Sequence, residues 1–138
     1  MNPVTVHIKK EEGLERFLTM NHFQVEALSD NVHRVQRADE VPVFLNITDN
    51  TIFFEVDLGG IKNIGSEKFY FDLLNLNTEI QPVSFGINNS QPEDPRLVLN
   101  ESRETTDLDD HELLSVFDAL ELAVDKAETL LQPILGQV

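Results

Sequence analysis

The sequence of 138 residues lacks cysteine and tryptophan and contains few basic residues. Without cysteine the chain can form no disulfide and offers neither a thiol nucleophile nor a thiolate metal ligand. No run approaches the ~20 apolar residues that a membrane-spanning helix requires. Residues 1–10 contain no apolar segment of the kind found in a signal peptide. These absences lead us to expect a cytoplasmic protein without direct membrane insertion.

Charge of positive sign is scarce, because 10 lysine and arginine residues stand against 25 aspartate and glutamate residues, for a net charge of −15. Such a chain repels phosphate backbones and anionic lipids, so we do not expect it to bind nucleic acid or a membrane surface. A protein partner, in particular a basic one, fits this charge better. The alternative is that the charge only keeps the protein in solution.

The apolar residues recur with the periods of helices and strands, and the length suits one domain. We therefore expect a single α+β domain over residues 1–138, with an antiparallel sheet of about five strands flanked by helices. A turn is expected at Gly59-Gly60 and a connector over residues 101–107. The element order is α-β-β-β-β-α-β-β-α, with helices at 9–20, 66–75 and from 109 to a stop at Gly136, and strands at 23–28, 32–37, within 41–58, at 83–87 and 96–100.

The clearest local structure is a hairpin over residues 41–58. Its turn, Thr48-Asp49-Asn50-Thr51, is expected to place both central residues at positive φ. The register then pairs Ile47 with Ile52, Leu45 with Phe54 and Val43 with Val56 on one face. The opposite face carries Phe44 opposite Glu55 and Phe53 opposite Asn46. We interpret Phe44 and Phe53 as candidates for a protein-contact surface, unless a helix covers that face and makes them core residues.

The C-terminal helix is predicted by apolar residues that recur at alternating spacings of three and four. Its acidic residues follow a similar spacing, and like charges so placed cost a helix a few tenths of a kcal/mol per pair. Only Lys126 offers local relief, so a basic partner could offset the repulsion, although a solvated face is the other interpretation. The candidate contact residues on this helix are Asp118, Glu121, Asp125 and Glu128.

Helix 66–75 is expected to begin at Ser66 as N-cap, with Glu67 favourable to the helix dipole. Its buried side is predicted to consist of Phe69, Tyr70, Leu73, Leu74 and Leu76.

The sequence offers few candidates for metal-binding or catalytic residues. The densest group of metal-ligand types lacks the glycine and the spacing of a calcium loop, and its single histidine makes a poor zinc site; it comprises Asp107, Asp109, Asp110, His111 and Glu112. We interpret it as the start of a helix whose carboxylates favour the helix dipole. The four histidines are dispersed and are expected to be surface or turn residues: His7, His22, His33 and His111. No nucleophile elbow or phosphate-binding loop occurs. We expect no cofactor and no metal.

The sequence therefore favours a non-catalytic protein-binding or adaptor module acting through an acidic helix face and an apolar sheet face. The alternative is a metal-dependent hydrolase or other enzyme centred on residues 107–112.

The order of elements resembles the fold of type III secretion chaperones and their YbjN-type relatives. That resemblance implies an acidic domain that binds other polypeptides, with a homodimer among the expected assembly states. The segments VPVFLNITDNTIFFEVDL and EKFYFDLLNLNTEIQPVSFGI also resemble the uncharacterised bacterial YjfI-like family, whose characteristic positions match Pro42, Pro82, Ser84 and Gly86. Members of that family are discussed alongside phage-shock and envelope-stress genes, which implies a role in stress response but no enzymatic activity or ligand.

Overall fold

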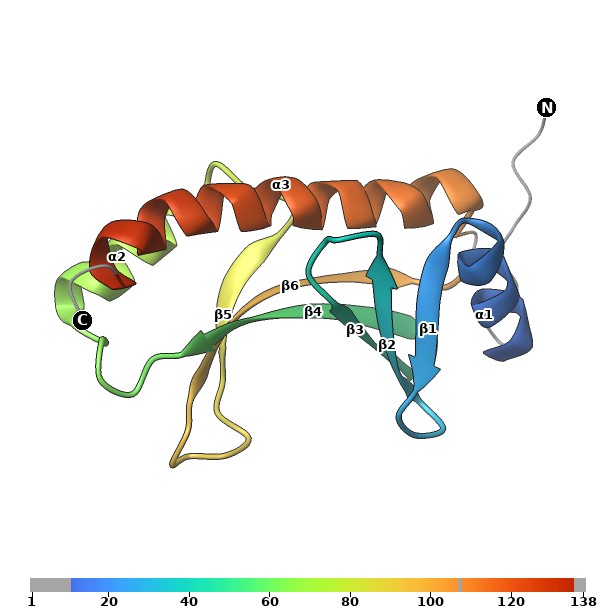
Figure 1. The fold of residues 1–138 in the computed structure, drawn as a ribbon, viewed down its shortest axis with the longest axis horizontal. Coiled ribbons are helices and arrows are strands. Elements are labelled where there is room, and N and C mark those ends of the chain that lie inside the picture. The colour runs from blue at the N-terminus through green and yellow to red at the C-terminus, as the bar shows by residue number, and fades with distance from the viewer. Residues whose placement is uncertain (1–10, 107, 136–138) are drawn as a thin grey trace. The chain divides into compact units, whose positions relative to one another are not determined.

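The computed structural model describes residues 11–106 and 108–135. Within these residues the chain forms three helices and six strands in the predicted order (Figure 1). Their bounds are α1 Glu11–Met20, β1 Phe23–Ala27, β2 Val32–Arg37, β3 Val43–Thr48, β4 Thr51–Gly60, α2 Glu67–Leu76, β5 Ser84–Asn88, β6 Arg96–Glu104 and α3 Asp110–Leu135.

The strands form one sheet in the order β1-β2-β3-β4-β6-β5. Four neighbouring pairs are antiparallel: β1–β2, β2–β3, β3–β4 and β5–β6. The α+β class and the element order are confirmed. The sheet has six strands and not about five, because every strand of the predicted order joins it.

By internal contacts the chain divides into two compact units. Unit 1 comprises Met1–Val56 and Glu101–Phe117, and unit 2 comprises Asp57–Asn100 and Asp118–Val138. Each unit contains buried apolar residues of its own. The assignment of residues 1–138 to a single domain stays a prediction.

The predicted register of the β3–β4 hairpin is confirmed. Ile47 pairs with Ile52 and Leu45 with Phe54, and all but Ile47 are fully buried. The turn differs from the prediction, because Asp49 has a φ of 55° while Asn50 is not among the described residues with positive φ. The main chain of Asn50 is instead held by Thr105, the residue that follows β6, since the Asn50 carbonyl accepts hydrogen bonds from the Thr105 N–H and the Thr105 hydroxyl.

Two predicted breaks are wrong. Gly59 and Gly60 end strand β4 and do not form a separate turn; Gly59 has a φ of 126°, and its N–H donates to Asp57 Oδ1. Residues 101–104 continue strand β6 and do not form a connector. No local pattern indicates this extension, because Glu101, Ser102 and Arg103 are polar.

The core of unit 1 contains three aromatic rings from distant parts of the chain. Phe117 of α3 lies 4.6 Å from Phe23 of β1 and meets Phe54 of β4 edge-on at 5.7 Å, measured between ring centroids. Helix α1 lies beside β1 (Figure 1) and buries Leu14 and Leu18. These contacts cover the face of the sheet to which Phe54 points.

In unit 2, helix α2 begins as predicted, because the Ser66 hydroxyl accepts a hydrogen bond of 3.1 Å from the Phe69 N–H. Its buried side is narrower than predicted. Phe69 and Leu73 are buried, whereas Leu74 is 67% exposed and Tyr70 is 37% exposed. Helix α2 carries apolar residues on most of its sides, so the sequence pattern could not show which of them face the core.

No helix in the described part of the chain is both long enough and apolar enough to cross a membrane.

Candidate functional site

The face of the sheet opposite the Phe54 side carries the two phenylalanines that the sequence singled out. Phe53 is 47% exposed and Phe44 is half-buried. Residues of a strand alternate between faces, so the residues paired laterally with these two share their face. We call this set the outer sheet face; it consists of Val32, Arg34, Phe44, Asn46, Phe53 and Glu55 of unit 1.

Two lateral rows build the outer sheet face. In one row Phe44 lies between Arg34 of β2 and Glu55 of β4. In the other, Asn46 lies between Val32 and Phe53. One row thus places an aromatic ring between a basic and an acidic residue, and the other places an amide between two apolar residues.

Phe53 is held toward solvent by its neighbours on the chain. Ile52 and Phe54 are fully buried, and the ring of Phe54 packs against Phe117. A register shift of one residue would bring Phe53 inward only by exposing both of these side chains. The exposure of Phe53 is therefore a property of the fold and does not depend on a chosen rotamer.

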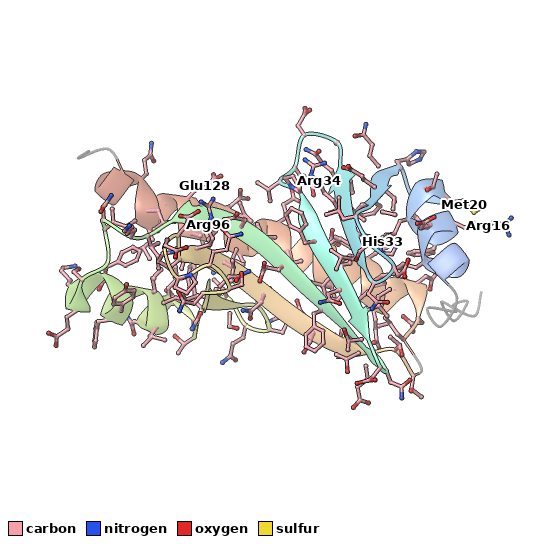
Figure 2. The ribbon with its side chains drawn as sticks, turned by 90° about the horizontal axis from the view of Figure 1, so that it is seen from below. Arg16, Met20, His33, Arg34, Arg96 and Glu128 are labelled. Atoms are coloured by element: carbon pink, nitrogen blue, oxygen red, sulfur yellow. The ribbon has the colours of Figure 1, made fainter. Side chains whose placement is uncertain are left out.

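The acidic helix strip consists of Asp118, Glu121, Asp125 and Glu128. All four side chains are exposed on the part of α3 that belongs to unit 2, and Figure 2 labels Glu128. The buried side of the same helix segment carries Leu120, Ala123, Val124, Ala127 and Leu131. The predicted division of this helix into an apolar and an acidic side is therefore present.

The basic residues of unit 2 are engaged mostly with acceptors outside the strip. Lys126 Nζ donates to the Glu79 carbonyl at 3.1 Å, an acceptor that lies outside the strip. Arg96, labelled in Figure 2, donates to Asp57 and Asp94, and the hydrogen bond to Asp57 raises the pKa of Arg96 above its usual value. Both of these basic side chains therefore bind acceptors outside the strip.

The structure brings Phe44 and Phe53 together on one face and the four carboxylates together on one helix side. The two surfaces belong to different units. Each surface is therefore complete within its own unit.

The acidic and histidine group at the start of α3 serves in part as a helix cap. Asp109 Oδ1 accepts a hydrogen bond of 2.7 Å from the Glu112 N–H, and Asp110 Oδ1 accepts one from the His111 N–H. Both are the unpaired donors of a helix N-terminus. Among the described residues, no group of three or more histidine, aspartate or glutamate side chains could hold a metal ion; Asp107 lies outside them.

His33 was expected at the surface or in a turn, and this is wrong. It is 1% exposed, and its Nε2 lies 3.2 Å from Oε1 of Glu15 on α1. Its Nδ1 is buried without a hydrogen-bond partner among the described residues. Figure 2 labels His33 next to Arg34; these successive residues of β2 point to opposite faces. His22 and His111 are exposed as expected, and His7 lies outside the described residues.

Glu101 is a second buried polar group that the sequence did not reveal. Its side chain is 2% exposed and forms an ion pair with Arg103 two residues along β6. Burial raises the pKa of Glu101, and the Arg103 guanidinium opposes part of that effect. A glutamate in a polar stretch carries no local sequence signal of burial.

Exposed apolar side chains outside the predicted surfaces were also missed. The largest exposed fractions are those of Met20, Phe71, Leu74 and Leu122, each between 66% and 73%. Phe71 and Leu74 lie one turn apart on α2.

Solved structures with the same fold come from type III secretion systems and from E. coli. One chain of the heterodimeric ExoU–SpcU complex of Pseudomonas aeruginosa superposes with a TM-score of 0.68 at 20% identity, over 87% of this chain and 98% of that one. YbjN from E. coli gives 0.61 at 14% identity, over 93% and 96%. The chaperone SycH of Yersinia pestis, in complex with a stable fragment of YscM2, gives 0.56 at 23% identity, over 85% and 95%. The fold is therefore that of type III secretion chaperone-like proteins.

The chain belongs to the CesT_Tir_1 family, whose model matches residues 8–133. The resemblance to the chaperone and YbjN-type fold is thereby confirmed, whereas the narrower YjfI-like name is not. No curated protein matches the sequence.

Proposed function

We propose that this protein is a non-catalytic, chaperone-like module of the cytoplasm that binds another polypeptide. The observation that carries the proposal is the exposure of Phe53 on a sheet face whose register keeps it there. Support comes from the family and from structures of the same fold that contain a bound protein, namely the ExoU–SpcU complex and SycH with its YscM2 fragment.

The outer sheet face supplies the apolar contact in this proposal. Phe44 and Phe53 bind apolar side chains of the partner, since aromatic residues dominate the energy of many protein interfaces. The acidic helix strip binds basic side chains of the same partner or a second one, and so increases the association rate more than the affinity. We also propose that the chain assembles as a homodimer. Sedimentation of the purified chain measures this assembly state.

The test is a binding comparison between matched variants. Proteins captured from the native cytoplasm by the wild-type chain are compared with those captured by Phe53→Asp and by Phe71→Asp. Phe71 is a still more exposed aromatic residue outside the outer sheet face. We expect Phe53→Asp to lose the partner and Phe71→Asp to retain it, with thermal unfolding midpoints near that of the wild type.

Retention of the same partner by a folded Phe53→Asp variant would contradict the use of this face. Loss of cooperative unfolding in Phe53→Asp would instead make Phe53 a core residue, the alternative that its sequence position left open. Activity that depends on a divalent ion, with a matching rise in melting temperature, would overturn the non-catalytic part of the proposal.

A further inference from the structure

The main-chain N–H of Phe85 is hydrogen-bonded to a side chain and not to the sheet. It donates to Oδ1 of Asn77 at a donor–acceptor distance of 2.7 Å. Phe85 lies in β5, the last strand of the sheet, and its partner residue on β6 is Leu99. Because Asn77 belongs to no strand, the Phe85 N–H must point away from β6.

The direction of this N–H fixes the directions of the others on β5. In an antiparallel pair, N–H groups of alternate residues point to the same side. The residues that exchange hydrogen bonds with β6 are therefore Ser84 and Gly86, and the Ile87 N–H points outward with that of Phe85. The side chain of Ile87 is 51% exposed.

Outward N–H groups on an edge strand are a template for a further strand. A second copy of this chain is the occupant that fits, because two identical β5 strands can pair antiparallel about a two-fold axis with their Ile87 side chains in contact. At Phe85, however, Asn77 Oδ1 already occupies the place of the carbonyl oxygen that an added strand would bring.

Asn77 is held firmly enough for this role. It is the C-cap residue of α2, with helical φ and ψ angles, and its own N–H bonds to the carbonyls of Leu73 and Leu74. The side chain thus extends from a fixed helix end to the strand.

We propose that Asn77 caps the outer edge of β5 and prevents this edge from pairing with the β5 strand of a second copy. The cap satisfies one of the two outward N–H groups in the middle of a five-residue strand, and its side chain lies where the incoming strand would lie. The inference concerns unit 2 alone and stands apart from the partner proposed for the outer sheet face.

The first test is amide hydrogen exchange measured by NMR. In Asn77→Ala the Phe85 amide should exchange about tenfold faster than in the wild type, as expected for the loss of one hydrogen bond. Asn77→Asp keeps an oxygen at the same position and should retain the slow exchange. Equal exchange of the Phe85 amide in Asn77→Ala and the wild type would overturn the cap.

The second test is the assembly state, measured by sedimentation over a range of concentrations. Asn77→Ala should form larger, concentration-dependent assemblies, whereas Asn77→Asp should sediment as the wild type does. Adding Ile87→Pro to Asn77→Ala should reverse the effect, because proline removes an outward N–H without removing a hydrogen bond to β6.

Ile87→Pro in the wild-type background keeps the inference testable even if Asn77→Ala does not fold. This single variant should leave the assembly state unchanged, because in the wild type the capped β5 strand does not pair with a second copy. Dissociation of a wild-type assembly by Ile87→Pro would show that β5 pairs in spite of Asn77 and would overturn the proposal. Unchanged sedimentation of a folded Asn77→Ala would overturn it as well.

Discussion

The rings of Phe23 and Phe117 lie 4.6 Å apart, centroid to centroid, with their planes tilted by 51°. Phe23 begins β1 and Phe117 lies on α3, so the contact joins two distant parts of the chain within unit 1. Phe117 also meets Phe54 edge-on. One ring of α3 thus fixes the helix against two strands and keeps the apolar side of the β3–β4 hairpin inward.

Phe117→Ala should lower the free energy of unfolding by about 3–5 kcal/mol, the usual cost of truncating a buried phenylalanine. Urea denaturation measures the change. Phe53→Ala is the matched control, because Phe53 lies on the same hairpin as Phe54 but on its exposed side; it should cost under about 1 kcal/mol. Equal losses for the two variants would show that Phe53 is also core.

Asp109→Ala should lower the free energy of unfolding by about 1 kcal/mol, because the first turn of α3 loses the acceptor of the Glu112 N–H. Asp109→Ser retains a hydroxyl oxygen and should recover most of the loss. Thermal denaturation of the three proteins side by side provides the measurement. A serine variant as unstable as the alanine variant would mean that the carboxylate does something other than cap the helix.

Glu101 should make stability depend on pH. Its raised pKa means that the folded state holds this proton more tightly than the unfolded chain does. Its contribution to stability is therefore fully present below the ordinary pKa of glutamate and is lost as the pH rises through the folded-state pKa. Because Glu101→Gln cannot ionise, its stability should rise relative to that of the wild type as the pH increases above the ordinary pKa of glutamate, about 4.3.

The comparison for Glu101 is a series of urea unfolding curves over that pH range. Glu104→Gln, an exposed position on the same strand, serves as the control and should follow the wild type. If Glu101→Gln also followed the wild type at every pH, the carboxyl would not carry the buried charge that the structure assigns to it.

Reversing charge on the acidic helix strip should weaken binding of the partner that the wild-type chain captures. The double variant Glu121→Lys with Asp125→Lys should bind roughly tenfold more weakly at low salt, given the worth of two exposed ion pairs. The salt dependence of binding should also decrease. Titration calorimetry at two salt concentrations measures both effects.

The control for the strip makes the same change in net charge elsewhere, with Glu93→Lys and Glu104→Lys, both exposed. If the two double variants weakened binding equally, only the overall charge would matter. If neither did, the strip would be a solvated helix face, which is the other interpretation of its sequence.

Local patterns in the sequence were sufficient for the elements and for the hairpin. Aliphatic residues recur with period two on both sides of the turn between Val43 and Val56, so only one register buries them together, and the observed pairs match it. The same reasoning failed for α2, because Tyr70 and Leu74 belong to a helix that is apolar on most sides. The order of elements was enough to show the resemblance to the chaperone fold, because that order follows from periodicity alone.

The sequence predicted the candidate surfaces only in part. Phe53 could be assigned to a face but not to solvent, since that depends on whether another element covers the face. His33 and Glu101 look like surface residues in the sequence and are buried in the fold, and no local pattern around either residue indicates burial.

By itself the sequence determined the order of helices and strands, the register of the central hairpin, the acidic side of α3 and the excess negative charge. These follow from interactions among residues close in the chain, or from composition alone. Only the tertiary structure decided which apolar residues remain exposed, which polar groups are buried and which N–H groups at the sheet edge are already satisfied. Each of those depends on segments that folding brings together from distant positions, and local periodicity carries no record of them.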